Sequence, residues 1–179
     1  DWSPDGRLIA YESVYPEDVW IMNADGSGQR RLVSTPARDR APSWAPDGSR
    51  IVYMTEVRGV WQLFVVDVNT GPGTQITQGA GDKRFPVWSP DGDLIGYNTL
   101  TPDGSPDHVW TVAPDGANLT RITDAGQNGR PAWSPDGAYI VFNSNRSGPW
   151  LIWRARRDGS DPQPVSATAV GQRPDWGAR

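Results

Sequence analysis

A pentapeptide pattern, Trp-x-Pro-Asp-Gly, occurs four times in this chain of 179 residues. The copies begin at Trp2, Trp44, Trp88 and Trp133, and a degenerate fifth copy occupies residues 174–177. Successive copies start about 40–45 residues apart, a period typical of propeller blades built from one repeated unit. The chain is therefore expected to repeat one structural unit four times.

Each repeat contains four short segments that are typical of β-strands. The first ends at the motif tryptophan, and the second follows the motif glycine, over residues 7–13, 49–55, 93–99 and 138–144. Apolar residues alternate along the second segment, which places them on one face of a strand. The third segment is centred on an aromatic residue, and the fourth carries an aliphatic one. These residues are Trp20, Phe64, Trp110 and Trp153 in the third segment and Leu32, Ile76, Ile122 and Val165 in the fourth.

The turns between these segments suit tight β-hairpins. In Ser-Pro-Asp-Gly, proline fixes φ early in the turn and glycine takes the positive φ that follows. A second glycine turn recurs in each repeat, at Gly26, Gly71, Gly116 and Gly159. Four antiparallel strands per repeat, stacked radially, predict an all-β protein with β-propeller architecture and four repeats in this chain. The large aromatic residues are expected to pack between blades.

The whole chain, residues 1–179, is predicted to be a single propeller domain or part of one. The repeats span approximately 2–43, 44–87, 88–132 and 133–175. The first repeat lacks its innermost strand, because its motif starts at the second residue, and residues 172–176 are a spare innermost strand. A start at Asp1 instead of methionine indicates a processed or truncated N-terminus.

Composition argues against several classes of protein. The formal net charge is −4, and nucleic-acid-binding domains usually have a basic face, so no nucleic-acid partner is expected. The absence of cysteine excludes disulfides and thiolate metal sites. No run of about 20 apolar residues is present, so no membrane span is expected. No signal peptide is recognisable, and no phosphate-binding loop or cofactor site is expected.

The repeats resemble those of the TolB-like β-propeller family, whose signature is Trp-Ser-Pro-Asp-Gly. The resemblance extends to the later pattern of each repeat, such as Ile95-Gly96-Tyr97, Val109 to Val112, Asp115-Gly116 and Ile122-Thr123. It covers essentially the whole chain. It implies a periplasmic or secreted protein that binds a protein or peptide, or a propeller attached to a serine peptidase of the prolyl oligopeptidase type.

Propellers of this family usually have six or more blades, and three explanations for four repeats remain open. The chain is a piece of a larger ring, or it closes as a four-bladed ring, or two chains join edge to edge as a homodimer with eight blades. We favour the dimer, because wedges filled with aromatic residues would be strained in a ring of four blades. A spare strand and an incomplete blade would then complement each other by two-fold exchange.

The two ends of the propeller are expected to differ. One end carries the short Pro-Asp-Gly turns, and the other carries irregular loops, where binding usually resides. These loops are residues 14–17, 56–60, 100–107 and 145–149 within repeats, and residues 34–40, 78–84, 124–130 and 167–173 between them. We predict that this loop end, together with the channel mouth that it surrounds, is the interaction surface.

An arginine precedes the innermost strand in each linking loop, at Arg40, Arg84, Arg130 and Arg173. These side chains are candidate binding residues, because a collar of guanidinium groups suits a carboxylate or phosphate. The alternative is that each arginine pairs with Asp39, Asp82, Asp124 or a nearby carbonyl. The motif aspartates, Asp5, Asp47, Asp91 and Asp136, are interpreted as turn residues and not as metal ligands.

Catalytic constellations are not recognisable, and the chain is predicted not to be an enzyme. The single histidine, His108, cannot form a zinc site without further ligands, and no Gly-x-Ser-x-Gly nucleophile motif occurs. A propeller that hydrolyses carbohydrate remains an alternative, because carboxylate pairs such as Glu17 with Asp18, or Asp103 with Asp107, are present. Loop carboxylates of this kind are usually solvated.

The sequence therefore favours a non-enzymatic binding or scaffold propeller that recognises a protein, peptide or glycan through its loop end. The first alternative is an accessory propeller of a larger enzyme such as a serine peptidase. The second is a repeat protein whose main property is self-assembly into a closed ring. An engineered repeat is disfavoured, because the repeats differ considerably outside the motif.

Overall fold

The computed structural model describes residues 1–101, 103, 105–165 and 174, and the regular structure of this part of the chain is entirely β-strand. Its 15 strands form four antiparallel sheets, each a meander in chain order. None of the described residues belongs to a helix of the length and apolar character that a membrane crossing requires. The predicted all-β propeller with four blades is confirmed.

The strands follow the repeats closely. The first sheet contains β1 (Leu8–Glu12), β2 (Val19–Asn23) and β3 (Arg30–Arg31). The second contains β4 (Asp39–Trp44), β5 (Arg50–Val57), β6 (Val60–Asp67) and β7 (Thr74–Gln75). The third contains β8 (Asp82–Trp88), β9 (Ile95–Leu100), β10 (Val109–Val112) and β11 (Thr120–Arg121). The fourth contains β12 (Asn128–Trp133), β13 (Tyr139–Ser144), β14 (Leu151–Arg156) and β15 (Gln163–Pro164).

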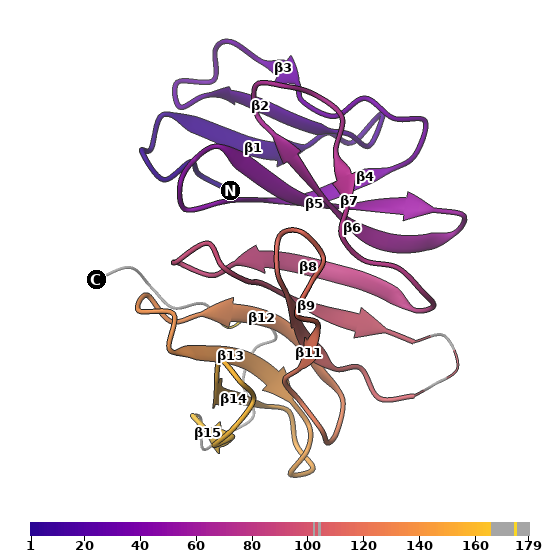
Figure 1. Ribbon diagram of the computed structural model, residues 1–179, viewed down its shortest axis with the longest axis vertical. Coiled ribbons are helices and arrows are strands. Elements are labelled where there is room, and N and C mark those ends of the chain that lie inside the picture. Colours follow the sequence, from indigo (N-terminus) through magenta and orange to yellow (C-terminus); the bar gives the residue numbers. More distant parts are fainter. Residues whose placement is uncertain (102, 104, 166–173, 175–179) are drawn as a thin grey trace.

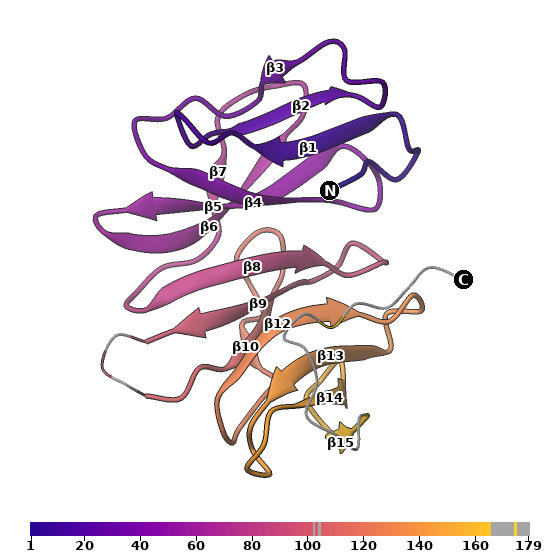
Figure 2. The same cartoon turned by 180° about the vertical axis from the view of Figure 1, so that it is seen from behind.

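The four sheets fan out in chain order, with the first at the top of Figures 1 and 2 and the fourth at the bottom. The innermost strands β4, β8 and β12 contact one another in succession. In the first sheet, a single bridge between Trp2 and Ile9 stands where the other sheets have an innermost strand. The spare strand predicted at residues 172–176 lies outside the described residues, apart from Pro174.

The hairpin turns follow the predicted chemistry. The motif glycines have positive φ, for example 69° at Gly6 and 77° at Gly92, a region that side-chain-bearing residues rarely adopt. The amide N–H of each motif glycine donates to the carbonyl three residues earlier, as from Gly92 to Ser89 at 2.9 Å. This bond closes the turn between the first two strands of the blade.

The fourth strand of each blade differs from the prediction. The strands β3, β7, β11 and β15 contain only two residues each, and the aliphatic residues assigned to them lie immediately after these strands. The N–H groups of these aliphatic residues still donate to the neighbouring strand, as from Ile76 to Leu63 at 2.9 Å. The chain then turns inward, which buries Ile76 and Ile122. The outermost strand is therefore short because the same segment must start the link to the next blade.

Apolar side chains fill the spaces between neighbouring sheets, which we name the first, second and third interfaces in chain order. The second strand of each blade carries the pattern Ile-x-Tyr/Phe. Its isoleucine is fully buried at Ile51, Ile95 and Ile140. The aromatic residue two places later, Tyr53, Tyr97 or Phe142, is also buried. Each of these side chains contributes to the apolar cluster of its interface. The repeated Ile-x-Tyr/Phe pattern thus builds all three interfaces.

The corresponding residues of the first sheet are less buried. Ile9 and Tyr11 are half-buried, and Trp2 is 56% exposed, compared with 5% for Trp44. Within the described part of the chain, no sheet covers this face of β1 and β2. An apolar face that three other blades bury therefore remains accessible on the first.

Candidate functional site

One end of the propeller carries the Pro-Asp-Gly turns, and their carboxylates are engaged within the turns. The hydroxyl of Ser3 donates to Asp5 at 2.7 Å, and the hydroxyl of Ser134 donates to Asp136 at 2.6 Å. These hydroxyl donors have the largest effect in holding the pKa values of Asp5 and Asp136 below their ordinary value. The backbone N–H groups of Arg7 and Ala138 add to the effect. One oxygen of each of these carboxylates is therefore used to shape the hairpin.

The opposite end carries loops that differ between repeats, and we call it the loop end. In Figure 1 it includes the β5–β6 hairpin and the β9–β10 connection, toward the right of the view. Large apolar side chains are exposed on these loops, most fully Val14 (92%) and Tyr15 (96%). Leu100 and Trp150 are also exposed on or next to their loops. Irregular loops with exposed apolar side chains are where a rigid scaffold usually contacts a partner.

Arg40 lies in an ion-pair cluster at the loop end. Its Nε donates to Glu17 at 2.9 Å, and its Nη2 donates to the other carboxylate oxygen of Glu17. Arg38 pairs with Glu56 at 2.6 Å. The guanidinium groups of Arg38 and Arg40 lie 5.4 and 5.7 Å from the centre of a Trp61 ring, in cation–π range. The hydrogen bond from Arg40 lowers the pKa of Glu17, so this cluster holds both charges at neutral pH.

The remaining candidate arginines are arranged differently from Arg40. Arg84 donates to Asp82 through Nη2 at 2.7 Å, within its own strand. Arg130 stacks on the ring of Phe85, with its guanidinium carbon 4.4 Å from the ring centre. Arg173 lies outside the described residues. The structure therefore brings Arg130 onto the neighbouring blade and pairs Arg40 and Arg84 with carboxylates.

The difference arises from a β-bulge that recurs in the innermost strands. Ala41, Phe85 and Arg130 all have φ near +50°, each immediately before a proline, and the pairing register shifts at each point. Arg130 occupies the bulge itself, whereas Arg40 and Arg84 precede it by one residue. The unequal spacing of these arginines from the motif tryptophan is the sequence signal of this difference. A cavity of about 260 Å³ lies among the bulged segments.

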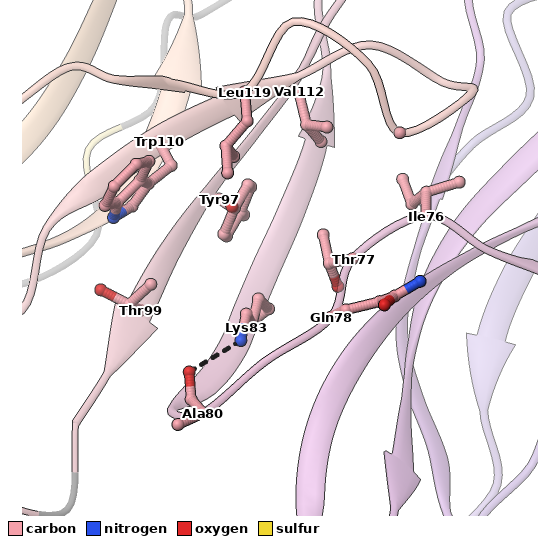
Figure 3. Close-up of a pocket in the computed structure, with 11 residues that line it drawn as sticks. Ile76, Thr77, Gln78, Ala80, Lys83, Tyr97, Thr99, Trp110, Val112 and Leu119 are labelled. Carbon is pink, nitrogen blue, oxygen red and sulfur yellow. Dashed lines mark hydrogen bonds between the residues drawn. The ribbon is translucent and has the colours of Figure 1, made fainter.

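A second cavity, of about 420 Å³, lies in the second interface (Figure 3). The link after β7 forms one side with Ile76, Thr77 and Gln78, and the third sheet forms the other with Tyr97 and Trp110. Buried Lys83 lies at its base in the view of Figure 3. Sequence reasoning missed Trp61 and Lys83, because neither belongs to the repeated pattern.

The carboxylates considered for hydrolysis are engaged elsewhere. Glu17 binds Arg40, and Asp18 is buried and accepts from Arg31 at 2.9 Å. Asp103 accepts from the backbone N–H of Ser105 at 2.9 Å, which lowers its pKa.

His108 lies 3.2 Å from the hydroxyl of Thr123, and burial lowers its pKa. Among the described residues, His, Asp and Glu side chains form no group of three that could hold a metal ion.

Comparisons with known proteins agree with this architecture. Residues 1–101 match the family described as the TolB beta propeller domain. A TolB homolog of Chlorobium luteolum is 32% identical over 122 residues, which are 66% of this chain and 27% of that protein. The dipeptidyl-peptidase 5 of Porphyromonas gingivalis is 33% identical over 69 residues, which are 34% of this chain and 10% of the peptidase.

A solved structure assigned to TolB from Agrobacterium tumefaciens superimposes with a TM-score of 0.81 at 26% identity. The superposition covers 92% of this chain and 63% of that one. The chain spans less than half the length of the curated relatives that it matches.

Proposed function

The chain belongs to the TolB β-propeller family, and we propose that it is a non-enzymatic binding module that recognises a protein or peptide through its loop end. The observation that carries this proposal is the contrast between the two ends. At the turn end, one oxygen of each motif carboxylate is used within its own hairpin. At the loop end, the loops expose Val14, Tyr15, Leu100 and Trp150 and carry the charged cluster around Trp61. Aromatic residues and arginine are enriched at the energetic centres of protein interfaces. The family resemblance supports a periplasmic or secreted location.

Selection of peptides on the immobilised full chain tests this proposal. A displayed library of random peptides serves as the probe, and the affinity of enriched peptides is then measured by calorimetry. Tyr15→Ser and Trp150→Ser should each weaken binding by about tenfold or more, because interface anchors of this kind contribute at least ~1–2 kcal/mol.

The matched control is Val165→Ser, since Val165 is an exposed apolar residue on the outer edge of the fourth sheet. It should leave the affinity unchanged. Equal loss in all three variants, or peptides that ignore the loop end, would contradict the proposal.

The arginines at the mouth of the channel are proposed to contact acidic groups of the partner. Two contacts support this. Arg130 stacks on Phe85 and lines the cavity of about 260 Å³ among the bulged segments. Arg84 precedes Phe85 in β8, on the blade next to that of Arg130. Joint charge reversal, Arg84→Glu with Arg130→Glu, should weaken binding of acidic peptides more than of neutral ones. Unchanged binding of every acidic peptide would remove these residues from the site.

Two further candidate functions rest on specific observations. The match to a dipeptidyl-peptidase favours an accessory propeller of a larger enzyme, and a hydrolase domain in the complete reading frame would support it. The accessible face of the first sheet favours a homodimer that closes a ring of eight blades, because Trp2 and Tyr11 there resemble residues buried elsewhere. Light scattering at several concentrations should then show twice the mass of the 19.6 kDa chain, and Tyr11→Glu should restore the monomer.

A further inference from the structure

The three interfaces share one backbone arrangement, which allows them to be compared position by position. At the loop end of each, the innermost strand contributes one buried residue whose Cα partner lies on the next strand. These pairs are Asp39 with Thr55, Lys83 with Thr99, and Asn128 with Ser144. An aromatic pair lies beside each of them, Tyr53 with Phe64, Tyr97 with Trp110, and Phe142 with Trp153.

In the third interface, an arginine covers the aromatic pair. The guanidinium carbon of Arg146 lies 5.3 Å from the ring centre of Phe142 and 5.0 Å from that of Trp153. Its side chain is only 9% exposed. Its Nη2 donates to Asn128 Oδ1 at 3.4 Å, and its Nη1 lies 3.7 Å from Asp124. The guanidinium group of Arg146, with acceptors around it, therefore fills the loop end of the third interface.

In the second interface, the corresponding space is open. The residue at the position of Arg146, counted from the motif tryptophan, is Thr101, whose hydroxyl donates to the carbonyl of Ser105. None of the described residues of this loop (100, 101, 103 and 105–107) lines the cavity of about 420 Å³, to which Tyr97 and Trp110 both contribute. Cavities of about 300–1,000 Å³ are typical of small-molecule sites.

The wall of this cavity differs in charge from that of the third interface. Lys83 replaces Asn128, and its Nζ donates to the carbonyls of Gly79, Ala80 and Gly81 at 3.1, 2.9 and 2.8 Å. Asn128 holds its own linking loop in the same way, through Nδ2. Asn128 also offers an oxygen to a guanidinium group, which a lysine cannot. A bound cation would therefore meet repulsion where Arg146 meets an acceptor.

Two polar side chains line the cavity and have no hydrogen-bond partner among the described residues, Tyr97 and Gln78. Tyr97 as a whole is 2% exposed, but its hydroxyl is not one of the buried polar atoms left without a partner, so this group is accessible to a ligand acceptor. Gln78 is exposed on the other side of the cavity. No carboxylate is among the residues that line the cavity.

We infer that the second interface is a binding site for a small aromatic carboxylate. The ring of the ligand lies against Trp110 and Leu119, with Ile76 as a further apolar wall. The carboxylate accepts from the hydroxyl of Tyr97 and is attracted by the charge of Lys83. The ligand thus takes the place that Arg146 fills in the third interface, with the opposite charge.

Titration of the full chain with three isosteric probes tests the inference. The probes are 3-phenylpropionate, 3-phenylpropionamide and 3-phenylpropylammonium, followed by calorimetry and by tryptophan fluorescence. The carboxylate should bind at least tenfold more tightly than the amide, and the ammonium most weakly. Equal affinity for all three, or no binding of the carboxylate up to millimolar concentration, would overturn the inference.

Two variants locate the site. Lys83→Asn installs the residue that the third interface uses for the same carbonyl contacts, so the fold should persist and the preference for the carboxylate should be lost. Tyr97→Phe removes one hydroxyl and should weaken the carboxylate severalfold and the amide less, because a charged acceptor makes the stronger hydrogen bond. This variant keeps the test decisive if Lys83→Asn does not fold. The double variant Lys83→Asn with Thr101→Arg should fill the wedge as in the third interface and abolish binding of every probe. Undiminished binding by folded Tyr97→Phe and Lys83→Asn would place the ligand elsewhere.

Discussion

The first and third interfaces fill the same backbone frame with opposite chemistry. At its loop end, the first interface contains a buried carboxylate, Asp39, which accepts from the hydroxyls of Thr35 at 2.9 Å and Thr55 at 2.7 Å. The third contains the guanidinium group of Arg146, stacked on Phe142 and Trp153. The repeat therefore fixes the aromatic pair, whereas residues outside the motif decide the charge of each interface.

The largest expected effect comes from the shared aromatic position. Phe142→Ala removes a fully buried ring and the platform under Arg146. We expect a loss of about 3–5 kcal/mol in the free energy of unfolding, as is typical of buried phenylalanine. Chemical denaturation followed by tryptophan fluorescence measures it.

The matched control uses the same repeat position in the first sheet. Tyr11 is only half-buried, on the face that no described sheet covers. Tyr11→Ala should therefore cost much less, on the order of 1 kcal/mol. Similar losses in both variants would show that the repeat position and not the interface sets the stability.

A smaller effect is expected from the residue that fills the third interface. Arg146→Ala removes cation–π contacts to two rings and leaves a space beside Asn128. The free energy of unfolding should fall by about 1–3 kcal/mol. Arg154 is the control, because it stacks on the single ring of Tyr139 at 4.7 Å. If Arg154→Ala is as costly as Arg146→Ala, burial between two sheets adds nothing to the stacking.

Much of the fold could be predicted from the sequence because the repeat encodes it locally. Gly92 needs positive φ, and Ile95 and Tyr97 lie two residues apart, so turn and strand face follow from the residues themselves. The short outermost strands were missed because their ends are set by the link to the next blade. Ile76 keeps a backbone hydrogen bond but turns inward to reach the interface.

The sites were less predictable, because they depend on contacts between repeats. The candidate arginines share a place before the innermost strand but differ by one residue in their spacing from the tryptophan, and the bulge places Arg130 on Phe85 and leaves Arg84 beside Asp82. Lys83 and Arg146 do not belong to the repeated motif. Their different surroundings become visible only when each interface is compared with the next. Alignment of the repeats on the motif tryptophan places Lys83 at the same position as Asp39 and Asn128. This change of charge at one repeat position was the sequence signal that could have identified Lys83.

The smallest predicted effect concerns the charge of the first interface. Burial raises the pKa of Asp39, although the hydroxyls of Thr55 and Thr35 and the charge of Arg31 oppose this and the charge of Asp18 adds to it. A carboxyl whose folded-state pKa is raised destabilises the fold above that pKa, and the penalty disappears below the ordinary pKa of about 4. Asp39→Asn should therefore stabilise the protein at pH 7 by on the order of 1 kcal/mol, and the gain should vanish as the pH falls toward 3.

The control for this pH dependence has the opposite sign. The hydroxyl of Ser134 lowers the pKa of Asp136, so that carboxylate stabilises the fold at neutral pH and ceases to do so in acid. Asp136→Asn should therefore be less stable than the parent at pH 7 and equal to it at low pH. Thermal unfolding from pH 3 to 8 measures both variants. Destabilisation by Asp39→Asn at every pH would mean that the two threonine hydroxyls require a carboxylate, and that the charge of the first interface is a structural necessity.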